Sequence, residues 1–178
     1  MKPQSISSRF IRYIFLLLLL ASGQAGFLLA QNPIELTELL AAPAISEKTY
    51  LLEQLSRGAV PTMYLNQGVE TIIDPQKKTT RVITDIASIN QLYNQNSHFK
   101  NIELILIQIE NVSDLNWMLV VNSLNQFENL KYIYISSSVE LCEPSIGGDN
   151  CEKEKIKSFI SGELNPSITL VYSSEVSE

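Results

Sequence analysis

Apolar positions recur along the chain with two different periods, and the change of period separates helices from strands. Between residues 33 and 42, Ile34, Leu36, Leu39 and Leu40 follow a helical spacing that Pro43 ends. A second helical pattern runs from residue 46 to residue 58, with a Ser cap at its start and Arg-Gly at its end. The pattern therefore predicts two helices between residues 32 and 58.

The next stretch alternates β-forming residues around a turn sequence. Residues 69–74 and 79–84 are strand-like, and the segment DPQKK lies between them. Because Pro and Asp favour tight turns, we expect these two strands to form a hairpin.

The second half of the chain repeats itself. Residues 100–111 and 128–138 are both rich in Ile, Leu and Tyr, and they match at an offset of 28, which aligns Phe99 with Phe127 and Ile105 with Ile133. Residues 112–127, between them, have apolar positions at helical spacing and Ser113 as a candidate cap. This arrangement predicts a strand–helix unit.

A third copy follows when a ten-residue insertion is allowed. Residues 165–175 match the second strand at an offset of 38, which aligns Leu170 with Tyr132, and residues 151–162 supply a helix before them. Residues 80–85 and 85–99 are interpreted as the strand and helix of an earlier, shorter unit. Alternating strands and helices predict an α/β fold with a mainly parallel sheet, preceded by the N-terminal helices and the hairpin.

The repeated strands resemble those of leucine-rich repeats of the longer, helix-containing type. The resemblance covers about half of the chain after residue 30, and the family's Asn position is Glu110 in one copy and Ser138 in the next. It implies a short solenoid, and a small layered α/β sandwich is the alternative architecture. The positions that match the family's leucines are Ile102, Ile105, Ile107 and Val112 in one unit and Leu130, Ile133 and Ile135 in the next.

Four large apolar residues are expected to share the other face of the sheet, because they lie two apart on neighbouring strands: Leu104, Leu106, Tyr132 and Tyr134. One expectation is that the N-terminal helices cover them as core, since large apolar patches are rarely left exposed. The other is that they form a recognition patch for a protein ligand.

The first thirty residues have the layout of a secretory signal peptide. Lys2, Arg9 and Arg12 precede an apolar run, and small residues offer cleavage after Gly23, Ala25 or Ala30. An uncleaved membrane anchor is the alternative. Residues 31–178 are expected to form one domain, with a helical and hairpin part at 31–84 and the repeats at 85–178.

Composition limits the partners. The whole chain has a formal charge of −6, and without the three N-terminal basic residues 10 basic face 19 acidic residues, a charge of −9. Nucleic acid is therefore not an expected partner, because phosphate binding needs a basic surface. We expect a secreted or periplasmic protein with no membrane contact once the N-terminal segment is removed.

The candidate chemistry is sparse. His98 is the one histidine, and no nucleophile motif, metal-ligand spacing or phosphate-binding loop accompanies it, so we expect no cofactor and no metal, and an enzyme is the less favoured class. Cys142 and Cys151 are separated by eight residues that include Pro and two Gly, and in an exported chain this spacing predicts a disulfide rather than a redox pair or a metal site.

These observations favour an exported binding module that recognises an unidentified protein through the repeat sheet. The alternative is a small ligand-binding or enzymatic domain with a pocket at the carboxyl ends of the strands. That pocket would be lined by Glu110, Ser136, Ser137 and Ser138.

Overall fold

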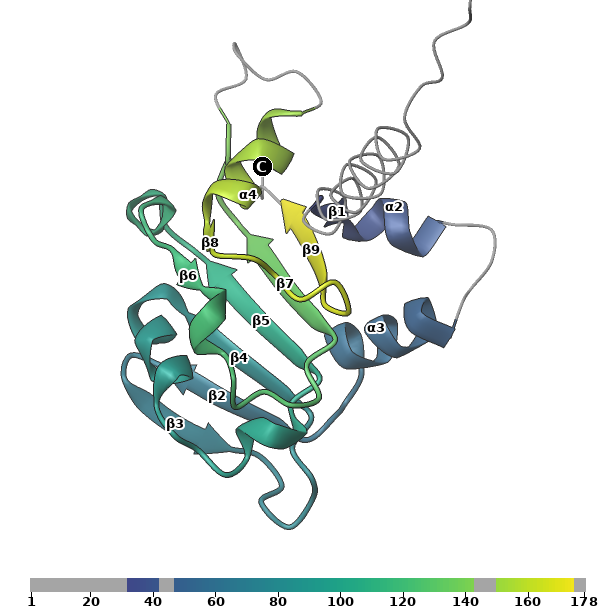
Figure 1. Cartoon of the computed structure of the whole chain (residues 1–178), viewed down its shortest axis with the longest axis vertical. Helices are drawn as coiled ribbons and strands as arrows, with labels where there is room; N and C mark the ends of the chain where they lie inside the picture. Colours follow the sequence, from purple (N-terminus) through teal and green to yellow (C-terminus); the bar gives the residue numbers. More distant parts are fainter. Residues whose placement is uncertain (1–31, 42–46, 143–149, 175–178) are drawn as a thin grey trace, which may run out of the picture. The chain divides into compact units, whose positions relative to one another are not determined.

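The sheet has seven strands in the order β1-β9-β7-β5-β4-β2-β3, and every neighbouring pair is parallel except β2 and β3 (Figure 1). The computed structural model describes residues 32–41, 47–142 and 150–174, so the expected signal peptide lies outside the described residues. The α/β class predicted from the sequence is confirmed. The strands are β1 (Ile34–Glu35), β2 (Thr62–Asn66), β3 (Val69–Ile72), β4 (Arg81–Asp85), β5 (Leu104–Ile109), β7 (Tyr132–Ser137) and β9 (Thr169–Ser174).

The segments between the strands include three α-helices and several 3₁₀ turns. The α-helices are α2 (Leu36–Ala41), α3 (Glu47–Arg57) and α4 (Cys151–Ser158). None of the helices in the described ranges combines the length and the apolar character needed to cross a membrane. The 3₁₀ turns are η1 (Ile86–Tyr93), η2 (Phe99–Asn101), η3 (Val112–Leu115) and η4 (Val121–Ser123). Two further strands, β6 (Leu119–Val120) and β8 (Ile160–Ser161), pair in parallel and form a second, small sheet.

The strand order explains why both faces of the sheet are covered. From β1 at one edge of the sheet the chain crosses to β2 near the other edge, and it then returns one strand at a time through β4, β5, β7 and β9. Parallel strands are nearly always joined by right-handed crossovers, so connections that run in opposite directions lie on opposite faces. The crossing through α2 and α3 is therefore on one face, and the returning connections are on the other.

The larger hydrophobic cluster lies on the face of the returning connections, which we call the repeat face. Ile105, Ile107 and Ile109 of β5 point into it. The rings of Phe99 and Phe127 stack there with 4.5 Å between their centroids, as the aligned phenylalanines of neighbouring units. Other fully buried members include Met63, Val82, Ile133, Ile135, Ile156 and Phe159.

The second cluster lies on the opposite face, which we call the helix face. Leu36 of α2 and Leu52 and Leu55 of α3 pack there. Since β5 and β7 are buried on both faces, their sequences are continuous apolar runs, as is usual for covered parallel strands. The sheet residues of this cluster are Leu104, Leu106, Tyr132, Tyr134 and Val171.

The predicted hairpin is wrong. β3 pairs antiparallel with β2, not with β4, through a two-residue turn in which Gln67 and Gly68 have φ of 49° and 80°. Two positive φ values suit the twist of a tight hairpin, and Gly adopts them without steric cost. The Gln-Gly pair therefore sets the hairpin one strand earlier, and β4 then joins β2 in parallel.

The repeat alignment is correct for one strand pair and wrong for the next. Leu104 pairs with Tyr132, which is the predicted offset of 28. Thr169 pairs with Tyr132, so the next offset is 37 rather than 38. A shift of one residue exchanges the two faces of a strand. Leu170 consequently belongs to the repeat face and Val171 to the helix face.

The helices expected at residues 85–99 and 112–127 are 3₁₀ turns and, in the second case, also the short strand β6. In the second segment Asn111, not Ser113, is the cap, and Asn111 and Asp114 form a reciprocal capping box. Asn and Ser side chains compete for backbone groups and disfavour helix interiors, which accounts for the short turns in this Asn-rich segment. The helix expected at residues 151–162 is present as α4 but ends at Ser158.

The buried guanidinium of Arg81 fixes the end of α3 on the sheet. It donates to the carbonyl oxygens of Leu55 (2.8 Å) and Ser56 (3.3 Å) in the last turn and to the hydroxyl of Thr62 (3.0 Å). A cation at a helix C-terminus satisfies carbonyls that have no partner within the helix. Burial lowers the pKa of Arg81, while the nearby Tyr64 side chain acts to raise it.

We predict that Arg81→Leu lowers the free energy of unfolding by about 2–3 kcal/mol, because carbonyls at the end of α3 lose a charged donor. Arg57→Leu is the matched control, since Arg57 is an exposed arginine in the same last turn. Urea titration followed by circular dichroism measures both variants. Equal unfolding midpoints for the two would contradict the role assigned to Arg81.

The disulfide predicted between Cys142 and Cys151 is confirmed, with an S–S distance of 2.01 Å and Cα atoms 6.3 Å apart. It joins the segment after β7 to the first residue of α4. Cys142 packs against the cluster on the repeat face, whose buried members include Leu141 and Ile156.

We predict that replacing both cysteines by Ala lowers the free energy of unfolding by about 2.5–3 kcal/mol, the chain-entropy value for a loop of about ten residues. The sheet has its own core, so the double variant should keep one cooperative transition. Denaturant titration of the oxidised protein, the reduced protein and the variant checks this. Complete unfolding on reduction alone would show that the bridge supports far more than its own loop.

Candidate functional site

The four residues expected on the helix face are buried beneath α2 and α3. The exposed fractions are 0% for Leu104, 8% for Leu106, 3% for Tyr132 and 7% for Tyr134. The Tyr134 hydroxyl and the Ser173 hydroxyl are hydrogen-bonded at 2.7 Å. These side chains are core under the N-terminal helices, and the expectation of an exposed patch at these positions is not met.

Two tyrosines of the central strands have a raised pKa. Burial, with a smaller effect of Glu103, raises the pKa of Tyr132. Burial also raises the pKa of Tyr172 to about 12. The negative charges of nearby carboxylates contribute to this rise, and Glu152 contributes the most among them. Both phenols are therefore protonated at neutral pH.

Two of the four polar residues expected at the carboxyl ends of the strands bond backbone carbonyl oxygens. The Ser137 hydroxyl donates to the carbonyl of Val139 at 2.8 Å, and the Ser138 hydroxyl donates to the carbonyl of Ile109 at 3.2 Å. Ser136 is half-buried and Glu110 is exposed. Because the connections from β4, β5 and β7 all leave on the repeat face, they do not diverge to open a crevice between these strand ends.

Part of the helix face is not covered in the same way. α3 lies against β5 and α2 against β9, while β2, β3 and β4 extend beyond them (Figure 1). The strand register places Tyr64, Thr71 and Ile83 side by side on this face, and Ile83 next to Leu106. Tyr64 and Ile83 are half-buried, Thr71 is exposed, and Val69 of the edge strand β3 is 62% exposed. We call Tyr64, Val69, Thr71 and Ile83 the open face.

The open face was not predicted from the sequence, because the predicted hairpin paired residues 69–74 with the wrong strand. With Val69 and Thr71 paired to the strand at 79–84, their neighbours on the sheet could not be identified. The Gln67–Gly68 turn was the signal that would have placed them beside β2.

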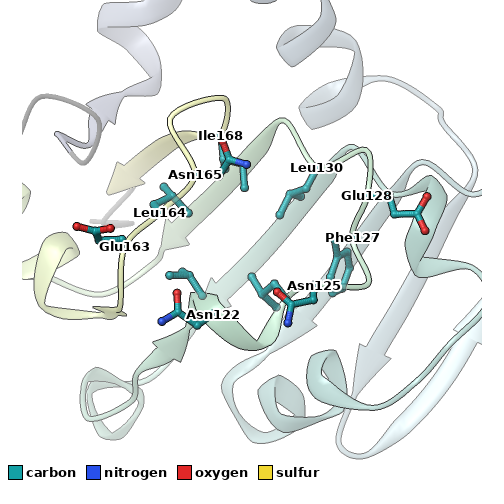
Figure 2. Close-up of a pocket in the computed structure, with 11 residues that line it drawn as sticks. Asn122, Asn125, Phe127, Glu128, Leu130, Glu163, Leu164, Asn165 and Ile168 are labelled. Carbon is teal, nitrogen blue, oxygen red and sulfur yellow. The ribbon is translucent and has the colours of Figure 1, made fainter. Parts of the chain in front are cut away.

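A pocket of about 350 Å³ lies on the repeat face, at the amino ends of β7 and β9. Figure 2 shows Asn122 and Asn125 on one side of it, Leu130 and Ile168 on the other, and Glu128 and Glu163 at opposite ends in this view. The remaining lining residues are Val121, Leu124, Phe127, Leu164 and Asn165, and none of the lining residues is basic.

The described residues contain no group of three or more His, Cys, Asp and Glu side chains placed to hold a metal ion. His98 is half-buried next to η2, and its side chain does not cap that turn.

No family model, no curated protein and no solved structure matches this chain. The resemblance to leucine-rich repeats consequently rests on the residues named from the sequence.

We predict that Tyr134→Phe lowers the free energy of unfolding by about 1 kcal/mol, because the buried Ser173 hydroxyl loses its partner. Ser173→Ala and the double variant complete a mutant cycle, and a coupling of about 1 kcal/mol is expected between the two sites. Thermal unfolding at neutral pH measures all four proteins. Additive effects would show that the hydroxyl pair contributes nothing of its own.

Proposed function

We propose that this protein is an exported, non-enzymatic interaction module that binds a protein partner through the open face and the edge strand β3. The observation that carries the proposal is the 62% exposure of Val69 on the open face, where half-buried Tyr64 lies between Thr71 and half-buried Ile83.

The chemistry of the open face suits a protein surface. Tyr is enriched at interfaces because its ring supplies apolar area and its hydroxyl a hydrogen bond. Ile73, directly after β3, is 53% exposed and extends the apolar surface along the edge.

The edge strand adds main-chain recognition. β3 pairs with β2 on one side. On its other side no strand among the described residues pairs with it, so β3 is an edge strand. The sequence of β3 is Val-Glu-Thr-Ile, so Glu70 is its one charged residue and the strand contains neither Lys nor Pro, which often protect natural edge strands. An extended segment of a partner can add to such an edge through backbone hydrogen bonds, with side-chain contacts giving specificity.

The disulfide supports export. A bridge between Cys142 and Cys151 is typical of an oxidising, extracytoplasmic compartment. Together with the signal-peptide layout of the first thirty residues, it favours a secreted or periplasmic protein.

The test compares Val69→Asp with Val112→Asp. Val112 is 70% exposed in η3, away from the open face, so the second variant has the same change at similar exposure. The immobilised exported chain is used to capture proteins from the culture medium and cell surface of the source. Val69→Asp should reduce capture of a specific protein about tenfold or more, because binding would bury the new carboxylate without a partner, and Val112→Asp should not.

Hydrogen exchange of the complex gives a second readout, because strand addition should slow exchange of the amides of residues 69–73. Equal capture by both variants, or protection confined to another part of the chain, would contradict the proposal. The two variants should have the same melting temperature, which separates a binding defect from a folding defect.

A further inference from the structure

We propose that the pocket at the amino ends of β7 and β9 binds a guanidinium or ammonium group on an alkyl stem, the chemistry of an arginine or lysine side chain. The pocket lies on the repeat face, so this inference is independent of the open face and goes beyond the function proposed above.

The charge of the pocket selects a cation. Glu128 and Glu163 are exposed at its two ends, and in the described part of the chain neither carboxylate forms an ion pair. Since no basic residue lines the pocket, an anionic ligand would meet two negative charges without compensation.

The side-chain amides add hydrogen-bond acceptors. Asn122 and Asn125 line the pocket, and their carbonyl oxygens match the donors of a guanidinium or ammonium group. The Asn165 side-chain oxygen accepts from the backbone N–H and the hydroxyl of Ser167, at 3.0 and 2.8 Å, so its two acceptor positions are used within the turn and Asn165 contributes a fixed wall of the pocket.

Gly162 makes room for Asn122. It has φ of +98°, and a Cβ added there would lie 3.0 Å from both the nitrogen and the oxygen of the Asn122 amide. The amide therefore packs closely on the backbone after β8, where a Cβ would force it to shift by a few tenths of an ångström. This close approach positions one wall of the pocket.

The apolar part of the lining fits an alkyl stem. Leu124, Leu130 and Leu164 are 7%, 7% and 4% exposed, so they present a limited apolar surface rather than a deep hydrophobic cavity. A volume of about 350 Å³ is near the lower end of known ligand pockets. It suits one long side chain better than a large molecule.

A neutral sugar fits less well. Sugar sites usually offer an exposed aromatic ring for stacking, but Phe127 is 6% exposed and its ring stacks on Phe99. Two of the polar lining residues, Glu128 and Glu163, carry negative charge, and a cation gains more from these carboxylates than a neutral hydroxyl does.

The test is a titration of the full exported chain, followed by amide resonances in two-dimensional NMR. The probe is N-acetyl-arginine N-methylamide, which represents an arginine within a peptide. The citrulline analogue, with a neutral urea in place of the guanidinium, has the same shape. We expect saturable shifts at Asn122, Asn125 and Asn165, and at least about tenfold weaker binding of the citrulline compound, since hydrogen bonds to charged groups are the strong ones.

Free L-arginine, which brings its own carboxylate, is a second arm that separates a free amino acid from a peptide side chain.

Substitutions of carboxylates inside and outside the pocket test where the cation binds. Glu128→Gln with Glu163→Gln should raise the dissociation constant about tenfold, while Glu110→Gln, an exposed carboxylate outside the pocket, should leave it unchanged. The spread of the amide chemical shifts in the same spectra shows whether each variant is folded. Equal binding of the citrulline compound, an unchanged constant in the double variant, or no saturable binding would each overturn the proposal.

Discussion

The docking of α2 and α3 across one face of the sheet is the constraint on which the rest of the structure depends. β1 and β2 are parallel strands separated by β9, β7, β5 and β4, so the chain between them must cross that face. The crossing buries the helix-face cluster, whose tyrosines would otherwise meet water. Arg81 binds the last carbonyls of α3, which fixes where the crossing ends and the sheet begins.

The same crossing decides which surfaces are available for binding. The helices lie against β5 and β9, and β2 to β4 keep Tyr64, Ile83 and Val69 partly or largely exposed. A solenoid of leucine-rich type would present its whole inner face to a partner. Here the open part is displaced toward the antiparallel edge, where strand addition and side-chain contacts can act together.

Sequence patterns predicted the strands of the repeats better than the segments between them. The offset of 28 was correct because equivalent side chains in neighbouring parallel strands lie opposite each other, as Ile105 and Ile133 do. The later offset failed by one residue because apolar side chains occupy both faces of β9, so Leu170 and Val171 fit either register. The expected helix at 112–127 failed because a helical spacing of apolar residues does not outweigh repeated Asn and Ser.

The pocket could not be predicted from the sequence, because its walls come from two connections about forty residues apart. Asn122 and Asn125 follow β6, and Glu163 and Asn165 follow β8, so the pairing of Leu119 with Ile160 brings the two walls together. That pairing involves only two residues in each strand, too short to leave a pattern. The distance between the walls therefore depends on β6, β8 and Gly162 rather than on the repeat. A Cβ at position 162 would lie 3.0 Å from the Asn122 amide, so a larger residue there would shift this wall of the pocket while the strands of the main sheet keep their pairing.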